Sequence, residues 1–205
     1  LAKGVYPYLQ VLEELTSNIE IESEVSLGIN DIPIDRIVGT NSHARSTAFA
    51  SNFMPLLDED SEFAAKWIAL CDIHLKEGIR DPIKCYEFMN RFYVIEGNKR
   101  VSVLKYFGAV EITGEVTRII PRPDGSHESN IYREFLQFFK VAYINYLWFS
   151  KEGNFLKILQ VLGRTKREDW DTDFQKDFRS CYVRFSNAFK ALGGEKLHIT
   201  VGDAL

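Results

Sequence analysis

The residue types best suited to bind an anion stand together in one short run. This run holds an acid, a glycine, an amide and two cations: Glu96, Gly97, Asn98, Lys99 and Arg100. It follows the apolar segment Phe92–Ile95 and precedes a helical pattern that ends at Gly108, which predicts a strand turning at glycine into a helix. The first amides of a helix lack partners within it, and the helix dipole adds positive charge there. The run therefore predicts a phosphate site, with Gly97 allowing close approach and Lys99 and Arg100 supplying cationic donors.

The elements around this turn are predicted to form a mixed domain of helices and strands. Helical spacing predicts helices at 8–15, 44–53 and 61–77. The apolar face of the last of these is expected to comprise Phe63, Ala64, Trp67, Ile68, Cys71 and Leu75, with His74 beside it. Extended patterns predict strands at 19–27, 32–38, 83–88, 92–95 and 110–120. Because only Met89, Asn90 and Arg91 separate 83–88 from 92–95, these two strands are predicted to form a hairpin.

A turn-rich break divides the chain into two predicted domains. The segment 121–125 contains Pro121, Pro123 and Gly125, and the apolar spacing after it is helical throughout. Residues 1–122 are predicted to form the mixed domain, and residues 126–205 a domain of three helices. Thr200 and Asp203 match the start of a helix at the last residues of the chain. We therefore expect the helical domain to be truncated at its C-terminus and the chain to belong to a longer protein.

Composition and charge narrow the classes of protein that fit. A length of 205 residues with 45% hydrophobic content allows a sizeable core. A net charge of -4 and a pI near 5.7 argue against a surface dominated by nucleic-acid contacts, so any DNA binding would need a local patch or a further segment. The cysteines lie far apart and the histidines lack zinc-ligand spacing, so neither disulfides nor a metal site is predicted. Without a long apolar run or a secretory signal, a soluble, cytoplasmic protein with no membrane contact is expected.

The order of these segments is similar to that of a known superfamily. Residues 92–108 resemble the segment around the Gly-Glu-Arg-Arg motif of ParB proteins, including the glycine after the helix. Residues 32–37 and 40–45 resemble the ParB strand with its arginine-bearing loop, and residues 78–83 resemble the Gly-x-x-x-Pro-Ile step into the next strand. From 28 to about 120 the chain thus resembles the ParB/sulfiredoxin superfamily. The resemblance implies an α+β fold, a mixed sheet with helices, followed here by an all-helical extension.

The resemblance also implies a ligand. In that superfamily the loop after the glycine binds nucleotide phosphates, so residues 97–100 would bind a nucleoside triphosphate or diphosphate (CTP, ATP or ADP), with or without magnesium. Thr40 and Arg45 would add contacts, although Arg45 also fits a surface arginine at a helix start. Two departures matter. ParB has glutamate where this chain has Asn98, and the nucleophilic cysteine of sulfiredoxin is absent, which excludes cysteine-based reduction.

Three functions follow from the resemblance as expectations. The leading one is a nucleotide-binding, ParB-like domain of a bacterial DNA-associated protein or transcription regulator, non-catalytic or weakly hydrolytic. Its helical half would transmit binding to a partner or form a homodimer. Nuclease activity is a further property of the superfamily. The second is a small-molecule kinase, because free-serine kinases of the superfamily carry Asp-Gly-His-His-Arg and Glu96 would then act as base or magnesium ligand. The third is an interaction scaffold without catalysis.

Overall fold

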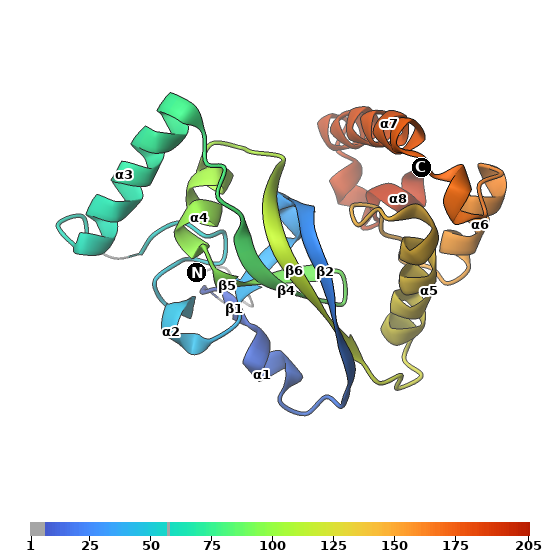
Figure 1. The fold of residues 1–205 in the computed structure, drawn as a ribbon, viewed down its shortest axis with the longest axis horizontal. Helices are drawn as coiled ribbons and strands as arrows, with labels where there is room; N and C mark the ends of the chain where they lie inside the picture. Colours follow the sequence, from blue (N-terminus) through green and yellow to red (C-terminus); the bar gives the residue numbers. More distant parts are fainter. Residues whose placement is uncertain (1–6, 57) are drawn as a thin grey trace. The chain divides into compact units, whose positions relative to one another are not determined.

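The computed structural model of the chain describes residues 7–56 and 58–205 (Figure 1), and the chain divides into two compact units at Arg122 and Pro123. In the described part of the first unit, six strands form one sheet: β1 (Gln10–Val11), β2 (Ile21–Pro33), β3 (Ile37–Thr40), β4 (Ile83–Phe88), β5 (Arg91–Glu96) and β6 (Glu111–Pro121). Its helices are α1 (Leu12–Thr16), α2 (His43–Ser46), α3 (Glu62–Glu77) and α4 (Asn98–Tyr106), with a 3-10 turn η1 (Ile34–Arg36).

The sheet places the ends of three strands at one edge. The strand order is β1-β3-β5-β4-β6-β2, and β1, β3 and β5 run parallel to one another. The strand β4 is antiparallel to β5 and parallel to β6, and β2 is antiparallel to β6. Because the parallel strands β1, β3 and β5 are followed by α1, α2 and α4, the starts of these three helices lie at the same edge of the sheet. In parallel sheets this is the edge at which ligands bind.

The regular elements of the second unit, residues 123–205, are all helices. It contains α5 (His127–Ala142), α6 (Asn154–Val161), η2 (Arg167–Asp169), α7 (Thr172–Ala191), η3 (Gly194–Leu197) and α8 (Val201–Ala204). Aromatic rings fill its interior: the ring centroids of Phe138 lie 5.2 Å from Phe155 and 5.9 Å from Trp170. The chain therefore has the predicted α+β fold followed by an all-helical part. Across residues 7–56 and 58–205, no helix is both long and apolar enough to cross a bilayer.

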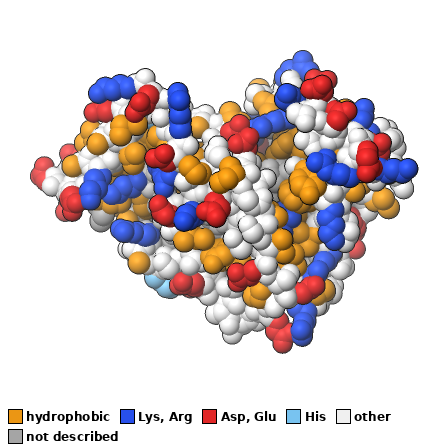
Figure 2. Space-filling view, viewed as in Figure 1, with side chains coloured by type: hydrophobic (Ala, Val, Ile, Leu, Met, Phe, Trp, Pro, Cys, Tyr) orange, Lys and Arg blue, Asp and Glu red, His pale blue; other side chains and the backbone are white. Residues whose placement is uncertain are grey.

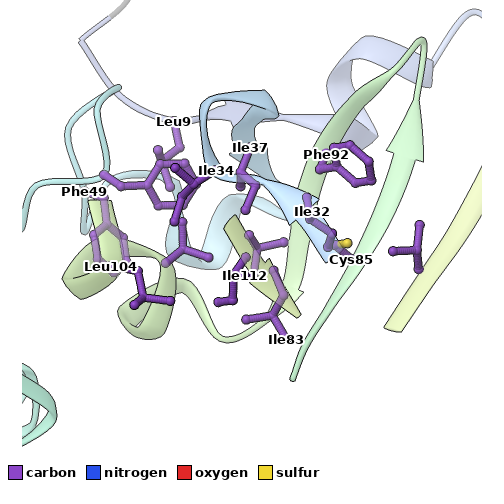
Figure 3. Packing of buried hydrophobic residues seen from close by; sticks show 14 residues of the cluster. Leu9, Ile32, Ile34, Ile37, Phe49, Ile83, Cys85, Phe92, Leu104 and Ile112 are labelled. Atoms are coloured by element: carbon purple, nitrogen blue, oxygen red, sulfur yellow. The ribbon is translucent and has the colours of Figure 1, made fainter. Parts of the chain in front are cut away.

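The core of the first unit lies between one face of the sheet and α4 (Figure 3). The strands contribute Ile32, Ile83 and Ile112, and α4 contributes Leu104, all of them buried. Close packing at the edge of the sheet also requires glycine. An added Cβ at Gly39 would stand 2.3 Å from the Gln10 carbonyl oxygen, so glycine allows β1 and β3 to approach.

The predicted hairpin between β4 and β5 is confirmed. Met89 and Asn90 link the two strands and have φ angles of 53° and 56°, as a two-residue hairpin turn of the primed type requires. The backbone amide of Asn90 donates to Glu87 Oε1 at 2.6 Å, and Glu87 Oε2 accepts a hydrogen bond from Arg118 Nε on β6. Both Glu87 and Arg118 are buried, so the core face of the sheet contains an ion pair.

Four predicted elements were wrong in part. The helix expected at 8–15 begins only at Leu12, because Gln10 and Val11 form the strand β1 beside β3. The strands expected at 19–27 and 32–38 are one long strand, β2, and a separate short β3, because β2 pairs with β6 along its length and accommodates Gly28 at a bulge. The helix expected at 44–53 stops at Ser46, since Phe49 and Ala50 form β-bridges instead. In contrast, the helix predicted at 61–77 is present as α3. It is capped at Ser61, whose hydroxyl accepts a hydrogen bond from the Ala64 backbone amide.

The predicted apolar face of α3 also needs correction. Ile68 and Leu75, which were expected on it, are exposed, with 55% and 69% of their surface accessible. His74 instead packs against Phe107, with ring centroids 5.0 Å apart. The inward side of the helix is therefore rotated toward His74, because it packs on α4 rather than on the sheet.

Candidate anion-binding site

Gly97 makes the corner between β5 and α4. It precedes the helix with a φ of 109°, a left-handed conformation that residues with a side chain rarely adopt. An added Cβ would stand 2.6 Å from Ile83 Cγ2, a buried side chain on the neighbouring strand. Both the backbone angle and the packing therefore require glycine at this position.

The start of α4 presents three backbone donors. The first hydrogen bond of the helix runs from the Val101 amide to the Gly97 carbonyl oxygen, at 3.0 Å. Within the described residues, the amides of Asn98, Lys99 and Arg100 have no acceptor, and no side chain caps the helix. Unpaired amides at a helix start, together with the helix dipole, form a site suited to phosphate.

Asn98 and Thr40 join the ends of two parallel strands beneath this corner. The Thr40 hydroxyl donates to the Val94 carbonyl oxygen at 3.0 Å, and Asn98 Nδ2 donates to Thr40 Oγ1 at 3.4 Å. Both residues are buried, and Asn98 Oδ1 has no donor among the described residues. These hydrogen bonds tie the first residue of α4 to the ends of β3 and β5, while the backbone amide of Asn98 is one of the three amides without an acceptor.

Lys99 brings a positive charge close to α3. Its Nζ lies 4.5 Å from the centroid of the Phe63 ring, in the first turn of α3. Partial burial lowers the pKa of Lys99, repulsion from Lys66 and Arg45 lowers it further, and attraction to Glu62 opposes the shift. Lys66 on α3 and Arg45 on α2 thus each repel the charge of Lys99. Such a group of cations is stabilised by a bound anion.

Arg100 points toward a different partner. Its Nη1 donates to the carbonyl oxygens of Asp81, at 3.0 Å, and Pro82, at 2.6 Å, in the segment between α3 and β4. Its Nη2 lies 3.5 Å from Glu96 Oε1. The guanidinium of Arg100 is therefore occupied in holding the α3–β4 segment against α4. The Glu96 side chain is 64% exposed and ends β5 immediately before the corner.

The predicted arginine loop lies beside α1. The Asn41 side chain donates to Glu13 at 3.2 Å, and the His43 ring lies 2.6 Å from Glu14. These contacts hold the start of α2 against α1 and place Arg45 on an exposed helix surface close enough to affect Lys99. Of the predicted contact residues, the structure brings together Gly97, the backbone amides of 98–100 and Lys99 at one corner, whereas Arg45 lies on the exposed surface of α2 and acts on Lys99 only through its charge.

Sequence reasoning missed Lys66. It lies one turn after Glu62, with which it forms an ion pair of 2.5 Å on the surface of α3. In sequence it looks like an ordinary exposed lysine, and only the packing of α3 on α4 brings it toward Lys99. Its spacing of three from Phe63 is the signal that could have found it, since both then lie on one side of the helix.

The described residues contain no preformed cluster of metal ligands. Among residues 7–56 and 58–205, no group of three histidine, cysteine, aspartate or glutamate side chains gathers that could hold a metal ion without the oxygens of a bound phosphate. Burial raises the pKa of the Cys85 thiol to about 12, and nearby Glu87 adds to the shift. This thiol therefore stays protonated and unreactive at neutral pH.

Comparison with known proteins gives a likeness of fold. No protein-family model matches the chain, and no curated protein matches it. Among solved structures, the chain is similar to sulfiredoxin from Arabidopsis thaliana, with 20% sequence identity, 43% of this chain and 82% of sulfiredoxin covered, and a TM-score of 0.30. This similarity concerns the fold alone and identifies neither a ligand nor a reaction.

Proposed function

We propose that the first unit binds a phosphate-bearing ligand, with a nucleotide as the leading candidate, at the corner between β5 and α4. The observation that carries this proposal is the set of three amides without acceptors at the start of α4, next to the charge of Lys99. Arg45 and Lys66 add charge from two other helices. In this proposal the phosphate accepts hydrogen bonds from the amides, and Lys99 turns from the Phe63 ring toward it.

The proposal separates the roles of the two neighbouring cations. Lys99 would contact the ligand, whereas Arg100 would act as a positioning residue because its guanidinium already donates to Asp81 and Pro82. Association with DNA and formation of a homodimer stay predictions of the family resemblance. Glu96 stays the candidate for catalysis, since its exposed carboxylate lies next to Gly97 and could reach a ligand.

Titration calorimetry tests the proposal directly. The full chain is titrated with CTP, ATP, ADP, GTP and inorganic tripolyphosphate, each with and without magnesium. Lys99→Met is expected to weaken binding about tenfold, close to the loss of one charge-assisted hydrogen bond. Lys76→Met is the matched control, because Lys76 is an exposed lysine in the last turn of α3, whose neighbour His74 packs on Phe107 at the far end of α4.

The outcomes separate binding from catalysis. If the wild type binds none of these five ligands, the proposed function is wrong. Binding of tripolyphosphate that competes with a nucleotide would support recognition through phosphate. Phosphate release or transfer to a small hydroxyl compound, lost in Glu96→Gln with binding retained, would favour an enzyme over a binding domain.

The lowered pKa of Lys99 predicts a pH dependence of binding. Because the charged form binds the anion, affinity is expected to fall as the pH rises toward the lowered pKa, earlier than for an ordinary lysine. The bound phosphate favours the charged form, so binding in this range takes up protons. Calorimetry between about pH 7.5 and about pH 9.5, where phosphate groups are fully ionised, measures both effects. Lys99→Arg keeps its charge throughout and should remove the dependence; an unchanged profile would assign it to another group.

A further inference from the structure

The helix α3 is attached to the first unit mainly through α4, and the two lie next to each other in Figure 1. Trp67 Nε1 donates to Ser102 Oγ at 2.8 Å, and the Trp67 ring packs edge-on against Tyr106 at 5.5 Å. Phe63 adds a contact with Phe49, at 5.3 Å between ring centroids. No residue of this helix is fully buried. An element with so little buried surface is expected to separate from its neighbour more easily than the core does.

The outer side of α3 is open to solvent. Ile68, Ile73 and Leu75 are exposed, and Figure 2 shows hydrophobic and charged side chains together at the surface where α3 lies in Figure 1. Packing on that side therefore does not fix the position of the helix. Its position depends on the contacts with α4 described above.

Charge at the first turn of α3 works against these contacts. Lys99 lies over the Phe63 ring, 4.5 Å from its centroid, and Lys66 lies one turn further along α3, so its charge repels that of Lys99. Arg45 on α2 adds to the repulsion on Lys99. Glu62 screens this repulsion by pairing with Lys66, but both side chains of that pair are more than half exposed. Exposed pairs of this kind contribute little, so the three cations keep a net repulsion.

We propose that Lys66 is a ligand-binding residue of the corner and that a bound phosphate joins α3 to α4. This inference rests on the proposed function. The phosphate contacts the start of α4 and replaces the repulsion between Lys66 and Lys99 with an attraction of both to one anion. Binding of the phosphate and packing of α3 on α4 are then linked. The ligand holds α3 on α4, and packing of α3 on α4 raises the affinity for the ligand.

The segment after α3 strengthens this link. Arg100, the third residue of α4, holds the carbonyl oxygens of Asp81 and Pro82, which follow the helix end at Gly78. In the proposal the first turn of α4 makes two contacts. Its backbone amides bind the phosphate, and the Arg100 side chain binds the segment that follows α3. A shift of α4 at the corner is transmitted to both ends of α3.

Hydrogen exchange read by mass spectrometry tests the inference on the full chain with saturating tripolyphosphate. Amides in 66–77 are expected to exchange several-fold more slowly with ligand, whereas peptides of α5 in the second unit stay unchanged. Lys66→Met should weaken binding about threefold and remove the added protection of α3. Lys76→Met, an exposed lysine at the other end of the same helix, is the matched control and should alter neither.

A variant that is expected to bind more tightly shows whether the effect of Lys66→Met is only a loss of helix structure. Glu62→Gln removes the acid that competes for Lys66, so this variant is expected to bind tripolyphosphate more tightly and to keep the protection of α3. Failure of the wild type to bind any of the five ligands of the calorimetric test would refute the proposed function itself. Binding without added protection of α3, or equal effects of Lys66→Met and Lys76→Met, would refute only the role of Lys66 and α3.

Discussion

Arg118→Met is expected to lower the free energy of unfolding by about 3–5 kcal/mol, because it leaves the carboxylate of Glu87 buried without its cationic partner. Glu87 is fully buried and Arg118 is 4% exposed, so water cannot replace the lost contact without rearrangement of the core face. Urea-induced unfolding followed by far-UV circular dichroism measures the change, and hydrogen exchange in β4 and β6 assigns it to the sheet.

Two further variants show whether the buried charge is the cause. Glu87→Gln combined with Arg118→Met removes both charges and keeps an oxygen for the Asn90 amide, so it should recover more than half of the loss. Arg122→Met breaks the exposed pair between Arg122 and Glu20 and should change stability by no more than about 1 kcal/mol. If the double variant is as unstable as Arg118→Met, lost packing rather than charge explains the effect.

Gly97→Ala is expected to abolish phosphate binding. Alanine at this φ of 109° costs about 1–2 kcal/mol, and the contact of its Cβ with Ile83 Cγ2 adds about 1–3 kcal/mol of overpacking. A shift of the first turn of α4 would relieve both the backbone strain and the contact with Ile83. The same shift would move the backbone amides of 98–100 away from the phosphate. Calorimetry with tripolyphosphate should show at least about a tenfold loss of affinity, and thermal unfolding should show the lower stability.

Gly108→Ala provides the matched control for this change. Gly108 follows the other end of α4 with a φ of 69°, and an added Cβ there would meet no atom within 4 Å. It should cost only the backbone strain of about 1–2 kcal/mol and leave phosphate affinity unchanged. Equal losses of affinity in Gly97→Ala and Gly108→Ala would mean that general destabilisation, rather than the corner, weakens binding.

The features predicted correctly from sequence are local ones. A strand, a glycine and a helix follow one another directly at Gly97, so hydrophobic spacing and the special angles of glycine suffice to predict the turn. The same holds for the hairpin at Met89 and Asn90. The α+β class follows because these patterns repeat along the first 120 residues and then change to helical spacing.

The features that sequence could not supply depend on contacts between distant segments. The direction of the Arg100 side chain is set by carbonyl oxygens about twenty residues upstream, and any residue type could have supplied those oxygens. The role proposed for Lys66 depends on how α3 packs on α4. Glu87 lies in a segment that reads as an ordinary strand, and only the register of β4 on β6 places it opposite Arg118.

The pairing of β2 with β6 has a consequence for how the chain is made. Pro33 pairs with Glu111 and Ile21 with Pro121, so β2 leaves the ribosome long before its partner exists. During that interval the apolar residues Ile21, Val25 and Ile29 have no partner strand. Pairing of such distant segments is slow and exposes the nascent strand to misassociation. β2 is also the last strand in the order of the described sheet, where these three residues stay exposed, so the acids Glu22 and Glu24 hinder association with other copies of the strand both during synthesis and afterwards.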